Sequence, residues 1–316
     1  MAEPPELRPL VAVVGPTGSG KSALALRLAQ TFHGEIVNCD SLQLYRYLDI
    51  GTAKPLAAER AGVPHHLFDL LDPDQVFTAG EYQRAVRSLL PRITARGKLP
   101  IIAGGTGFYL RALLEGLCPS PPRSDRLRAR LARRESLHPG WLHATLARFD
   151  SASAARIHPA DVQKLIRAVE VLLSTREPLS AWFGRGRDPI AGFRVLKLGL
   201  DPPRDALYSR LDARLDAMFA GGLLNEVRNV LSLGFPATSK ALEAHGYKQA
   251  IQVLRAEIEL PEAVALAKRN TRRYAKRQWT WFRGDPEVRW LQGFGDEPAT
   301  VQAALSAAAE FLSSGI

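Results

Sequence analysis

One segment near the N-terminus constrains the fold more than any other part of the chain. Residues 15–22 read GPTGSGKS, a full match to the pattern G-x-x-x-x-G-K-[ST]. An apolar run at residues 10–14 precedes it, and a helical pattern to about Thr31 follows it. Such a loop holds phosphate because its glycines let backbone N–H groups turn toward phosphate oxygens, while its lysine adds positive charge. We therefore expect a P-loop that binds a diphosphate or polyphosphate group.

Every residue of this loop is a candidate phosphate ligand. The hydroxyl that follows the lysine can also bind a magnesium ion. Ser22 is therefore the predicted metal ligand and Mg2+ the predicted cofactor. The predicted diphosphate-binding residues are Gly15, Pro16, Thr17, Gly18, Ser19, Gly20, Lys21 and Ser22.

Further strand patterns alternate with helical stretches along the chain. Apolar strand-like runs occur at residues 35–39, 99–103 and 194–200. This alternation predicts an α/β fold, a P-loop parallel sheet flanked by helices. Ligands of such sheets bind beyond the carboxyl ends of the strands. Asp40 and Thr106 follow two of the runs, so we expect both near the P-loop.

A break at residues 119–122, which read PSPP, interrupts the sheet pattern. Residues 123–183 then have a helical, arginine-rich pattern. We expect a core domain of residues 1–118 and 190–316, with an all-helical insertion domain at residues 119–189. A further helix is expected after Asp201, with Asp201 as its N-cap, and a long one at about residues 261–282.

The acid that P-loop nucleotide enzymes use for magnesium is missing from its usual place. Such enzymes carry an aspartate at the end of another strand, whereas the run at residues 99–103 ends in Gly104, Gly105 and Thr106. This weakens the case for ATP or GTP without excluding another acid. Asp40 could ligate magnesium or act as a general base, or it could simply cap the following turn.

The chain carries a net charge of +10, which suits a polyanionic partner such as nucleic acid but also an ordinary basic protein. No acidic residue occurs at residues 263–284, where two basic rows are spaced for one helix and aromatic residues lie among them. We favour RNA contact there over a merely solvated helix. The rows are Lys268, Arg272 and Lys276, and Arg269, Arg273 and Arg277.

Some residues allow two interpretations. Arg210 and Arg214 are spaced i,i+4 and suit phosphate oxygens, but could pair with Asp212 or Asp216 on the same helix. The adjacent histidines at 65 and 66 favour a structural role, since nothing with metal-ligand spacing accompanies them. Residues 49–55, DIGTAKP, suit a loop over the site.

The two cysteines, Cys39 and Cys118, have no CxxC partners and suit a reducing cytosol. No signal-peptide pattern and no apolar run of membrane-spanning length is present. We expect a cytoplasmic monomer that does not enter a membrane.

Several motifs together resemble one enzyme family. They are GPTGSGKS, the run from Asp40 to Gln43, DIGTAKP from Asp49, GGTGFYLRALLEG from Gly104, ARIHPADVQKLIRAVEV from Ala155, DPPRDALYSRLDARLDAMFAGG from Asp201 and AKRQWTWFR from Ala275. In this order they resemble the bacterial tRNA dimethylallyltransferases, and they span nearly the whole chain. The segment from Ala244 to Gln249 departs from the family, which usually has an apolar residue before Gly246 and an arginine before Gln249.

The resemblance implies transfer of a dimethylallyl group from dimethylallyl diphosphate to the exocyclic amine of the adenosine at tRNA position 37, with the anticodon stem-loop as the RNA partner. It implies Asp40, Thr106 and Arg214 as catalytic residues. The implied tRNA contacts are Asp40, Ser41, Leu42, Gln43, Arg128, Gln163, Lys164, Leu165, Ile166, Arg167, Gly246, Tyr247, Lys276, Arg277, Gln278, Trp279, Thr280, Trp281, Phe282 and Arg283. The competing functions are a small-molecule kinase, a prenyltransferase of free adenylate and a nucleic-acid-dependent ATPase.

Overall fold

The computed structural model describes residues 7–314 and is built on a six-stranded sheet. The strand order is β3-β2-β4-β1-β5-β6, and every neighbouring pair is parallel. The α/β fold predicted from the alternating pattern is confirmed. The strands are β1 (Arg8–Val14), β2 (Gly34–Asn38), β3 (His65–His66), β4 (Leu99–Ala103), β5 (Phe193–Asp201) and β6 (Val288–Gln292).

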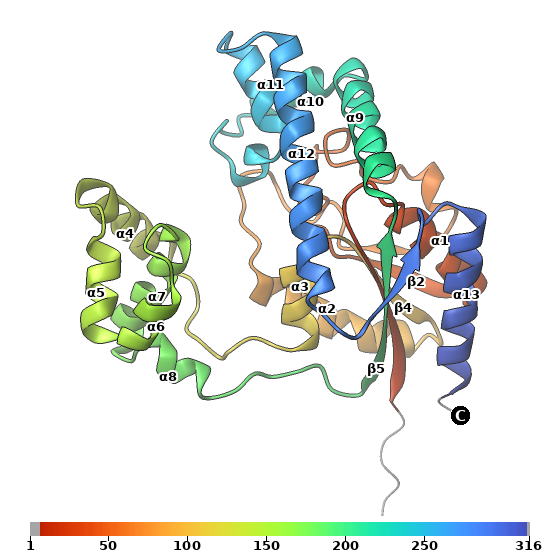
Figure 1. The fold of residues 1–316 in the computed structure, drawn as a ribbon, viewed down its shortest axis with the longest axis horizontal. Coiled ribbons are helices and arrows are strands. Elements are labelled where there is room, and N and C mark those ends of the chain that lie inside the picture. Colours follow the sequence, from red (N-terminus) through yellow and green to blue (C-terminus); the bar gives the residue numbers. More distant parts are fainter. Residues whose placement is uncertain (1–6, 315–316) are drawn as a thin grey trace, which may run out of the picture. The chain divides into compact units, whose positions relative to one another are not determined.

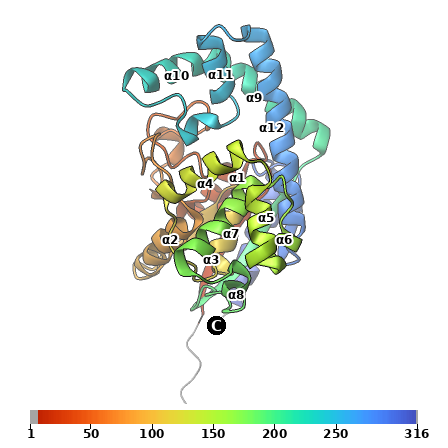
Figure 2. The same cartoon turned by 90° about the vertical axis from the view of Figure 1, so that its left-hand side faces the viewer.

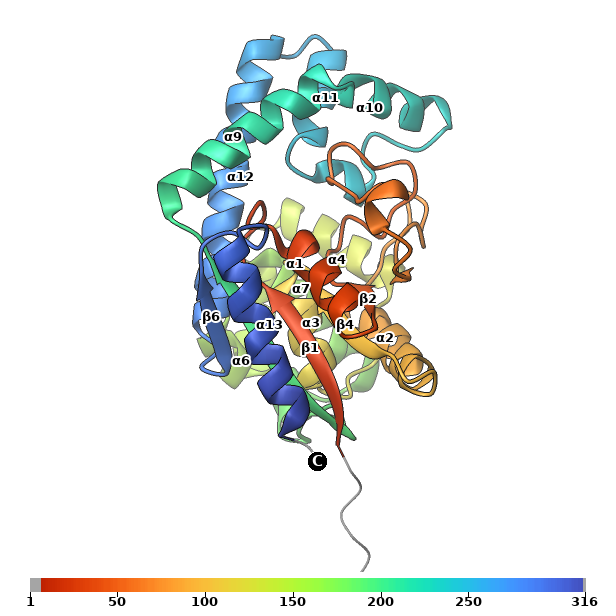
Figure 3. The same ribbon diagram turned by 90° about the vertical axis from the view of Figure 1, so that its right-hand side faces the viewer.

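The central strand β1 is covered by helices on both faces of the sheet. Its residues from Leu10 to Val14 are buried, which explains the unbroken apolar run at this place in the sequence. Val11 and Val13 share a hydrophobic cluster with residues of α1 (Lys21–Thr31) and α13 (Pro298–Ser313). Figure 3 shows these two helices side by side over one face of the sheet. The P-loop between β1 and α1 is therefore anchored at both ends in the core.

The remaining helices of the core unit surround the sheet or extend from its carboxyl edge (Figure 1). No helix among residues 7–314 is long and apolar enough to cross a membrane. The helices are α2 (Ala79–Thr94), α3 (Gly107–Leu114), α9 (Arg204–Ala220), α10 (Leu223–Ser232), α11 (Tyr247–Leu254) and α12 (Leu260–Arg283), with short 3-10 turns at Ala58–Arg60 and Lys240–Glu243.

A second compact unit spans Ala112–Ile190, so it includes the end of α3, and it consists otherwise of short helices around a core of its own (Figure 2). Its limits differ from the 119–189 expected from sequence because the connecting segments pair with each other: the Ile190 N–H donates to the Leu114 carbonyl at 2.9 Å. Its helices are α4 (Asp125–Leu137), α5 (Trp141–Phe149), α6 (Ser151–Arg156), α7 (Val162–Thr175) and α8 (Leu179–Phe183).

Two expectations about local structure were incomplete or wrong. The strand β6 was not predicted from sequence, because it is a short edge strand with no alternating pattern of its own. Asp201 is not the N-cap of α9: that position is Pro203, which makes no side-chain cap. The Asp201 carboxylate instead accepts a hydrogen bond from Arg283 at 2.9 Å. A long-range ion pair has therefore replaced the local cap.

The DIGTAKP loop is held by groups that lie far from it in sequence. Glu226 of α10 accepts hydrogen bonds from the backbone N–H groups of Asp49, Ile50 and Gly51, and from the Tyr247 hydroxyl. The Lys54 ammonium is buried and donates to both Asp49 and Asp69 at 2.6 Å. Lys54 therefore stabilises the loop, and its charge is neutralised by these two carboxylates.

Replacing Glu226 with alanine should destabilise this region. The change leaves three loop N–H groups and one buried hydroxyl without their acceptor, and an unsatisfied buried donor costs about 1–3 kcal/mol. We expect the free energy of unfolding to fall by at least that amount in chemical denaturation. Asn225→Ala, at the exposed neighbouring position, is the matched control. Equal stability of the two variants would remove Glu226 as the anchor of the loop.

Candidate functional site

Three turns meet at the carboxyl edge of the sheet. The P-loop follows β1, the Gly104–Thr106 turn follows β4, and Asp40 follows β2; these are adjacent strands in the order β2-β4-β1. The turns are joined by hydrogen bonds. The Ser41 N–H donates to Thr106 Oγ1 at 3.0 Å, and the Thr106 N–H donates to the Cys39 carbonyl at 3.0 Å. The sheet thus gathers Asp40, Thr106 and the P-loop, as the sequence predicts.

The P-loop lysine lies inside its own loop. Lys21 Nζ donates to the Pro16 carbonyl at 2.8 Å. Burial lowers the pKa of Lys21 to about 8, while the negative charge of Asp40 acts in the opposite direction and the positive charge of Arg214 adds to the lowering. Lys21, Asp40 and Arg214 therefore interact electrostatically. An anion bound in the loop would favour the protonated form of Lys21.

Asp40 is oriented by two neighbours in sequence. Its Oδ1 accepts from the Leu42 N–H at 2.9 Å, so it caps the turn, as one of the interpretations of the sequence proposed. Its own N–H donates to Asn38 Oδ1 at 2.8 Å, and the Asn38 amide donates to the Asp40 and Leu67 carbonyls. The second carboxylate oxygen, Oδ2, makes no hydrogen bond to any described residue and stays available for chemistry.

Asn38 was missed as a site residue from sequence. It is 1% exposed and makes three hydrogen bonds that fix the turn holding Asp40. The available signal was a polar residue within an otherwise apolar strand that ends at the predicted site. A buried asparagine in such a strand needs several partners, and those partners are backbone groups of the functional turn.

Arg214 reaches the P-loop from α9. Its Nη2 donates to Thr17 Oγ1 at 3.0 Å. Burial lowers its pKa, and the charge of Asp40 opposes this effect. Arg210, one turn earlier, instead forms a two-pronged pair with Asp296. Of the two arginines considered from sequence, the structure directs only Arg214 into the site.

The suggestion that these arginines pair with acids on their own helix is wrong. Asp212 and Asp216 form ion pairs with α12, to Arg272 at 2.5 Å and to Lys268 at 2.6 Å. These contacts also correct the interpretation of the basic helix. Because two members of the first basic row, Lys268 and Arg272, are bound by α9, that row does not face a phosphate backbone as a whole.

Gln278 lies inside the site and not on the RNA-facing surface expected for it. Its side chain is buried, and its Oε1 accepts from the Thr17 N–H at 2.7 Å. Its Nε2 donates to the Gly105 carbonyl at 2.9 Å. A Cβ atom on Gly105 would lie 2.1 Å from Nε2, and one on Gly107 would lie 2.2 Å from the Trp281 ring. The glycines after β4 therefore allow α12 to approach the P-loop.

Several other residues predicted to contact tRNA are buried in this structure. Trp279 and Phe282 lie in the core beneath α12, Tyr247 is fully buried against Glu226, and Gly246 is buried at the start of α11. Helical periodicity explains why they were included. A motif taken as a continuous run of residues also contains those on the helix face that packs against the core. The exposed residues of the segment are Lys276, Arg277, Thr280, Trp281 and Arg283.

Predicted tRNA contacts of the helical unit also include buried or paired residues. Leu165 and Ile166 are core residues of α7. Arg128 and Arg167 both donate to the fully buried Glu170, and Arg128 also donates to Gln163. The exposed face of this unit carries other arginines and Lys164, which pairs with Asp161. The exposed arginines of α4 are Arg126, Arg130, Arg133 and Arg134.

Two surface features of the core unit suit contact with RNA. A hollow of about 370 Å³ is lined by charged and aromatic residues, among them Arg204, Tyr208, Lys276, Trp279 and Arg283. The exposed rings of Phe108 and Trp281 meet edge to face, 6.5 Å between centroids. Phe108 was missed as a site residue, although it stands in the motif that follows Thr106.

Comparison with known proteins identifies the family. The model of the family described as IPP transferase matches residues 43–285. A tRNA dimethylallyltransferase from Solibacter usitatus is 59% identical over 304 residues, which cover 96% of this chain and 99% of the relative. One from Koribacter versatilis is 52% identical over 297 residues, with 94% and 96% covered. The chain belongs to the IPP transferase family.

Solved structures of this family share the fold. A full-length tRNA isopentenylpyrophosphate transferase from Bacillus halodurans matches with a TM-score of 0.71 and 34% identity, covering 98% of this chain and 96% of that one. A eukaryotic dimethylallyltransferase crystallised while acting on tRNA matches with a TM-score of 0.84 and 28% identity, covering 97% and 80%. The resemblance noted from the sequence motifs is thus confirmed at the level of family and fold.

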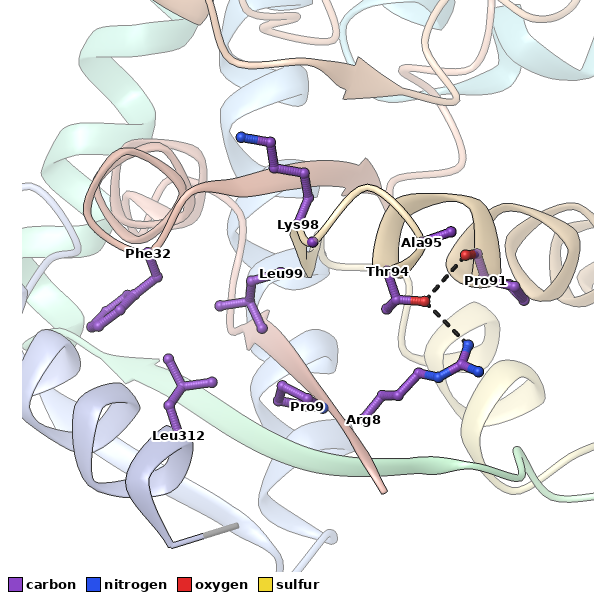
Figure 4. Close-up of a pocket in the computed structure, with 10 residues that line it drawn as sticks. Arg8, Pro9, Phe32, Pro91, Thr94, Ala95, Lys98, Leu99 and Leu312 are labelled. Carbon is purple, nitrogen blue, oxygen red and sulfur yellow. Dashed lines mark hydrogen bonds between the residues drawn. The ribbon is translucent and has the colours of Figure 1, made fainter. Parts of the chain in front are cut away.

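A second hollow in this family member lies away from the reactive edge. It measures about 700 Å³ and is found at the amino ends of β1 and β4 (Figure 4). Pro9, Phe32, Leu99 and Leu312 give it a mostly apolar lining, and Arg8 donates to Thr94 Oγ1 at 3.2 Å on its rim. Because ligands of parallel sheets bind at the carboxyl ends, we do not assign the reaction to this hollow.

Proposed function

We propose that this chain transfers the dimethylallyl group of dimethylallyl diphosphate to the exocyclic amine of the adenosine at tRNA position 37, next to the anticodon. One observation carries the proposal beyond family membership: Asp40, Lys21 and Arg214 converge on the P-loop, which gives a phosphate grip with a carboxylate beside it. Such a site can hold the leaving group and accept a proton at the same time.

The residues of the P-loop would stabilise the departing diphosphate. The allylic C–O bond breaks as negative charge develops on the diphosphate oxygens. Lys21, Arg214 and the loop N–H groups would offset that charge. The buried Ser19 hydroxyl and Arg214 Nε have no hydrogen-bond partner among the described residues, which suits an additional acceptor at this place.

Asp40 would serve as the general base. The adenosine amine forms a bond to the allylic carbon and must lose a proton, which Asp40 Oδ2 accepts. Its Oδ1 is held by the Leu42 N–H, so the carboxylate is oriented before the substrate arrives. The amine is a weak nucleophile, so holding it close to the prenyl carbon contributes strongly to the rate. The target base must leave its stack to reach this edge of the sheet.

We propose Mg2+ as the cofactor. The described residues contain no group of three His, Cys, Asp or Glu side chains that could hold a metal. Magnesium is commonly bound by one or two protein ligands together with substrate phosphates. Ser22, exposed in the first turn of α1, is the residue that would hold it. When bound, it would add charge stabilisation to the leaving diphosphate.

The tRNA would bind along the exposed side of α12 and the arginine-rich face of the helical unit. Arg269, Arg273 and Arg277 are exposed and form one i,i+4 row. Arg269 and Arg273 take part in no ion pair with the described residues. This row is therefore the better candidate for phosphate contact, whereas Lys268 and Arg272 already have carboxylate partners.

Neighbouring arginines of α12 should therefore differ in their effect on RNA affinity. Arg273→Gln should weaken tRNA binding and reduce the slope of log K against log salt by about 0.7 to 0.9, the value for one lost phosphate contact. Filter binding over a salt series measures this slope. Arg272→Gln is the matched control, because Arg272 pairs with Asp212. An unchanged slope for Arg273→Gln would contradict phosphate contact by the exposed row.

Three other functions compete with this proposal. A small-molecule kinase would use the P-loop, but this function does not explain the exposed basic row of α12. A prenyltransferase of free adenylate would not need the arginine-rich helical unit, and a nucleic-acid-dependent ATPase should carry an acid after β4, where Gly104, Gly105 and Thr106 stand.

One assay separates the four functions. The protein is incubated with labelled dimethylallyl diphosphate, ATP, tRNA and AMP in all donor–acceptor pairs. We expect label only in tRNA, with release of diphosphate. Label in AMP, phosphate transfer from ATP, or ATP hydrolysis that depends on tRNA would each select one of the other functions.

A further inference from the structure

Gln278 occupies one of the amide donors of the P-loop. In loops of this kind the backbone N–H groups turn inward and bind phosphate oxygens. Here the Thr17 N–H points to Gln278 Oε1 at 2.7 Å. The Gln278 side chain cannot easily turn away, because its Nε2 is bound to the Gly105 carbonyl at 2.9 Å and the side chain is 5% exposed.

The orientation of this amide is defined by its two partners. The Thr17 N–H can only donate and the Gly105 carbonyl can only accept, so the oxygen must face Thr17 and the nitrogen must face Gly105. The Thr17 side chain is held as well, since its hydroxyl accepts from Arg214. Thr17 is thus bound on both sides, by α12 through its backbone and by α9 through its side chain.

We infer that Gln278 is a specificity-determining residue that limits the P-loop to a two-phosphate ligand. The Ser19 N–H is also occupied, since it donates to the Pro16 carbonyl at 3.3 Å. The N–H groups at the start of α1, the Lys21 ammonium and Arg214 are left for the diphosphate of the donor. A third phosphate that needed the Thr17 N–H would have to displace Gln278 and leave its buried amide oxygen without a donor. An unsatisfied buried group of this kind weakens binding by about tenfold or more.

This inference deepens the proposed function and rests on it, since it explains why a loop that matches the nucleotide-binding pattern would accept an allylic diphosphate and reject ATP. A role for Gln278 in packing alone would predict something else. Loss of packing would lower the affinity for all phosphate ligands alike. Removal of the Gln278 amide from the Thr17 N–H would instead raise the affinity for the longer ligand relative to the shorter one. The ratio of two affinities therefore distinguishes the two roles.

The test measures the dissociation constants of inorganic diphosphate and inorganic tripolyphosphate by calorimetry at fixed magnesium, with the full chain. In Gln278→Met, which keeps the volume but loses both hydrogen bonds, we expect tripolyphosphate to gain about tenfold relative to diphosphate. Gln249→Met is the matched control, because Gln249 is also buried and caps a backbone N–H, that of Gly246 on α11. The control should leave the ratio unchanged.

Two further variants support the design. Gln278→Glu keeps the acceptor for Thr17 but places a negative charge beside the loop, so it should weaken both ligands and give tripolyphosphate no advantage over diphosphate. Gly105→Ala should reproduce the shift of Gln278→Met, since its Cβ atom would displace Nε2. If Gln278→Met does not fold, as judged by circular dichroism, Gly105→Ala takes its place in the test.

An unchanged ratio in a folded Gln278→Met or Gly105→Ala variant would overturn the inference. The measurement does not depend on catalysis, so its outcome is separate from that of the proposed function. Wild-type protein that transfers no prenyl group to tRNA contradicts the function. Wild-type protein that transfers it while the ratio stays fixed contradicts only the role of Gln278.

Discussion

Replacing Asp40 with asparagine is expected to lower kcat about 10²-fold or more, since a positioned general base contributes about 10² to 10⁴ in rate. Asparagine has nearly the same shape, and its oxygen can still accept from the Leu42 N–H that orients the side chain. The change therefore removes proton acceptance without opening the turn. Affinity for dimethylallyl diphosphate should change far less than kcat.

The measurement is single-turnover prenyl transfer to tRNA with both substrates saturating. Asp69→Asn serves as the control, because Asp69 pairs with Lys54 in the DIGTAKP loop and lies outside the proposed chemistry. A wild-type kcat in Asp40→Asn would remove Asp40 from the catalytic group. Its only role would then be to cap the turn after β2.

The second large effect is expected at Arg214. Arg214→Met keeps much of the length of the side chain and removes the charge that reaches Thr17 Oγ1. Loss of one donor that stabilises developing negative charge typically lowers kcat by about 10² to 10³. Because the guanidinium acts on charge that develops as the C–O bond breaks, we expect kcat to fall more than KM rises.

Arg210 offers a close control for this experiment. It lies one turn from Arg214 on the same helix, but its guanidinium is bound by Asp296. Arg210→Met should leave kcat near that of the wild type. Similar losses in the two variants would show that α9 contributes positive charge in general, and the specific role of Arg214 would be contradicted.

The sheet could be predicted from sequence because local patterns determine it. The apolar run before the P-loop, the run that ends at Asp40 and the run before Gly104 each correspond to a parallel strand whose carboxyl end lies at the site. The 3-10 turns, β3 and β6 were not predicted. A five-residue edge strand such as β6 (Val288–Gln292) carries too little pattern to distinguish it from a loop.

The residues that make up the site were harder to predict from sequence, because they depend on which faces of distant helices pack together. Nothing local to α12 indicates that Arg272 finds Asp212 on α9, or that Gln278 reaches the P-loop. Each contact joins residues far apart in the chain. Spacing along a helix identifies which residues share a face, but the partner of that face is set by tertiary packing. The buried Trp279 and Phe282 are the clearest cases of this limit.

The most direct measurement is competition at the P-loop during prenyl transfer to tRNA. Transfer of label from dimethylallyl diphosphate is followed while ATP or inorganic diphosphate is added at fixed free magnesium. We predict that saturating ATP barely slows the reaction and that inorganic diphosphate inhibits it, because diphosphate reproduces the group that the loop, Lys21 and Arg214 are arranged to hold. Hydrolysis of ATP in the presence of tRNA, with no prenyl label incorporated, would contradict the transferase function and favour an ATPase.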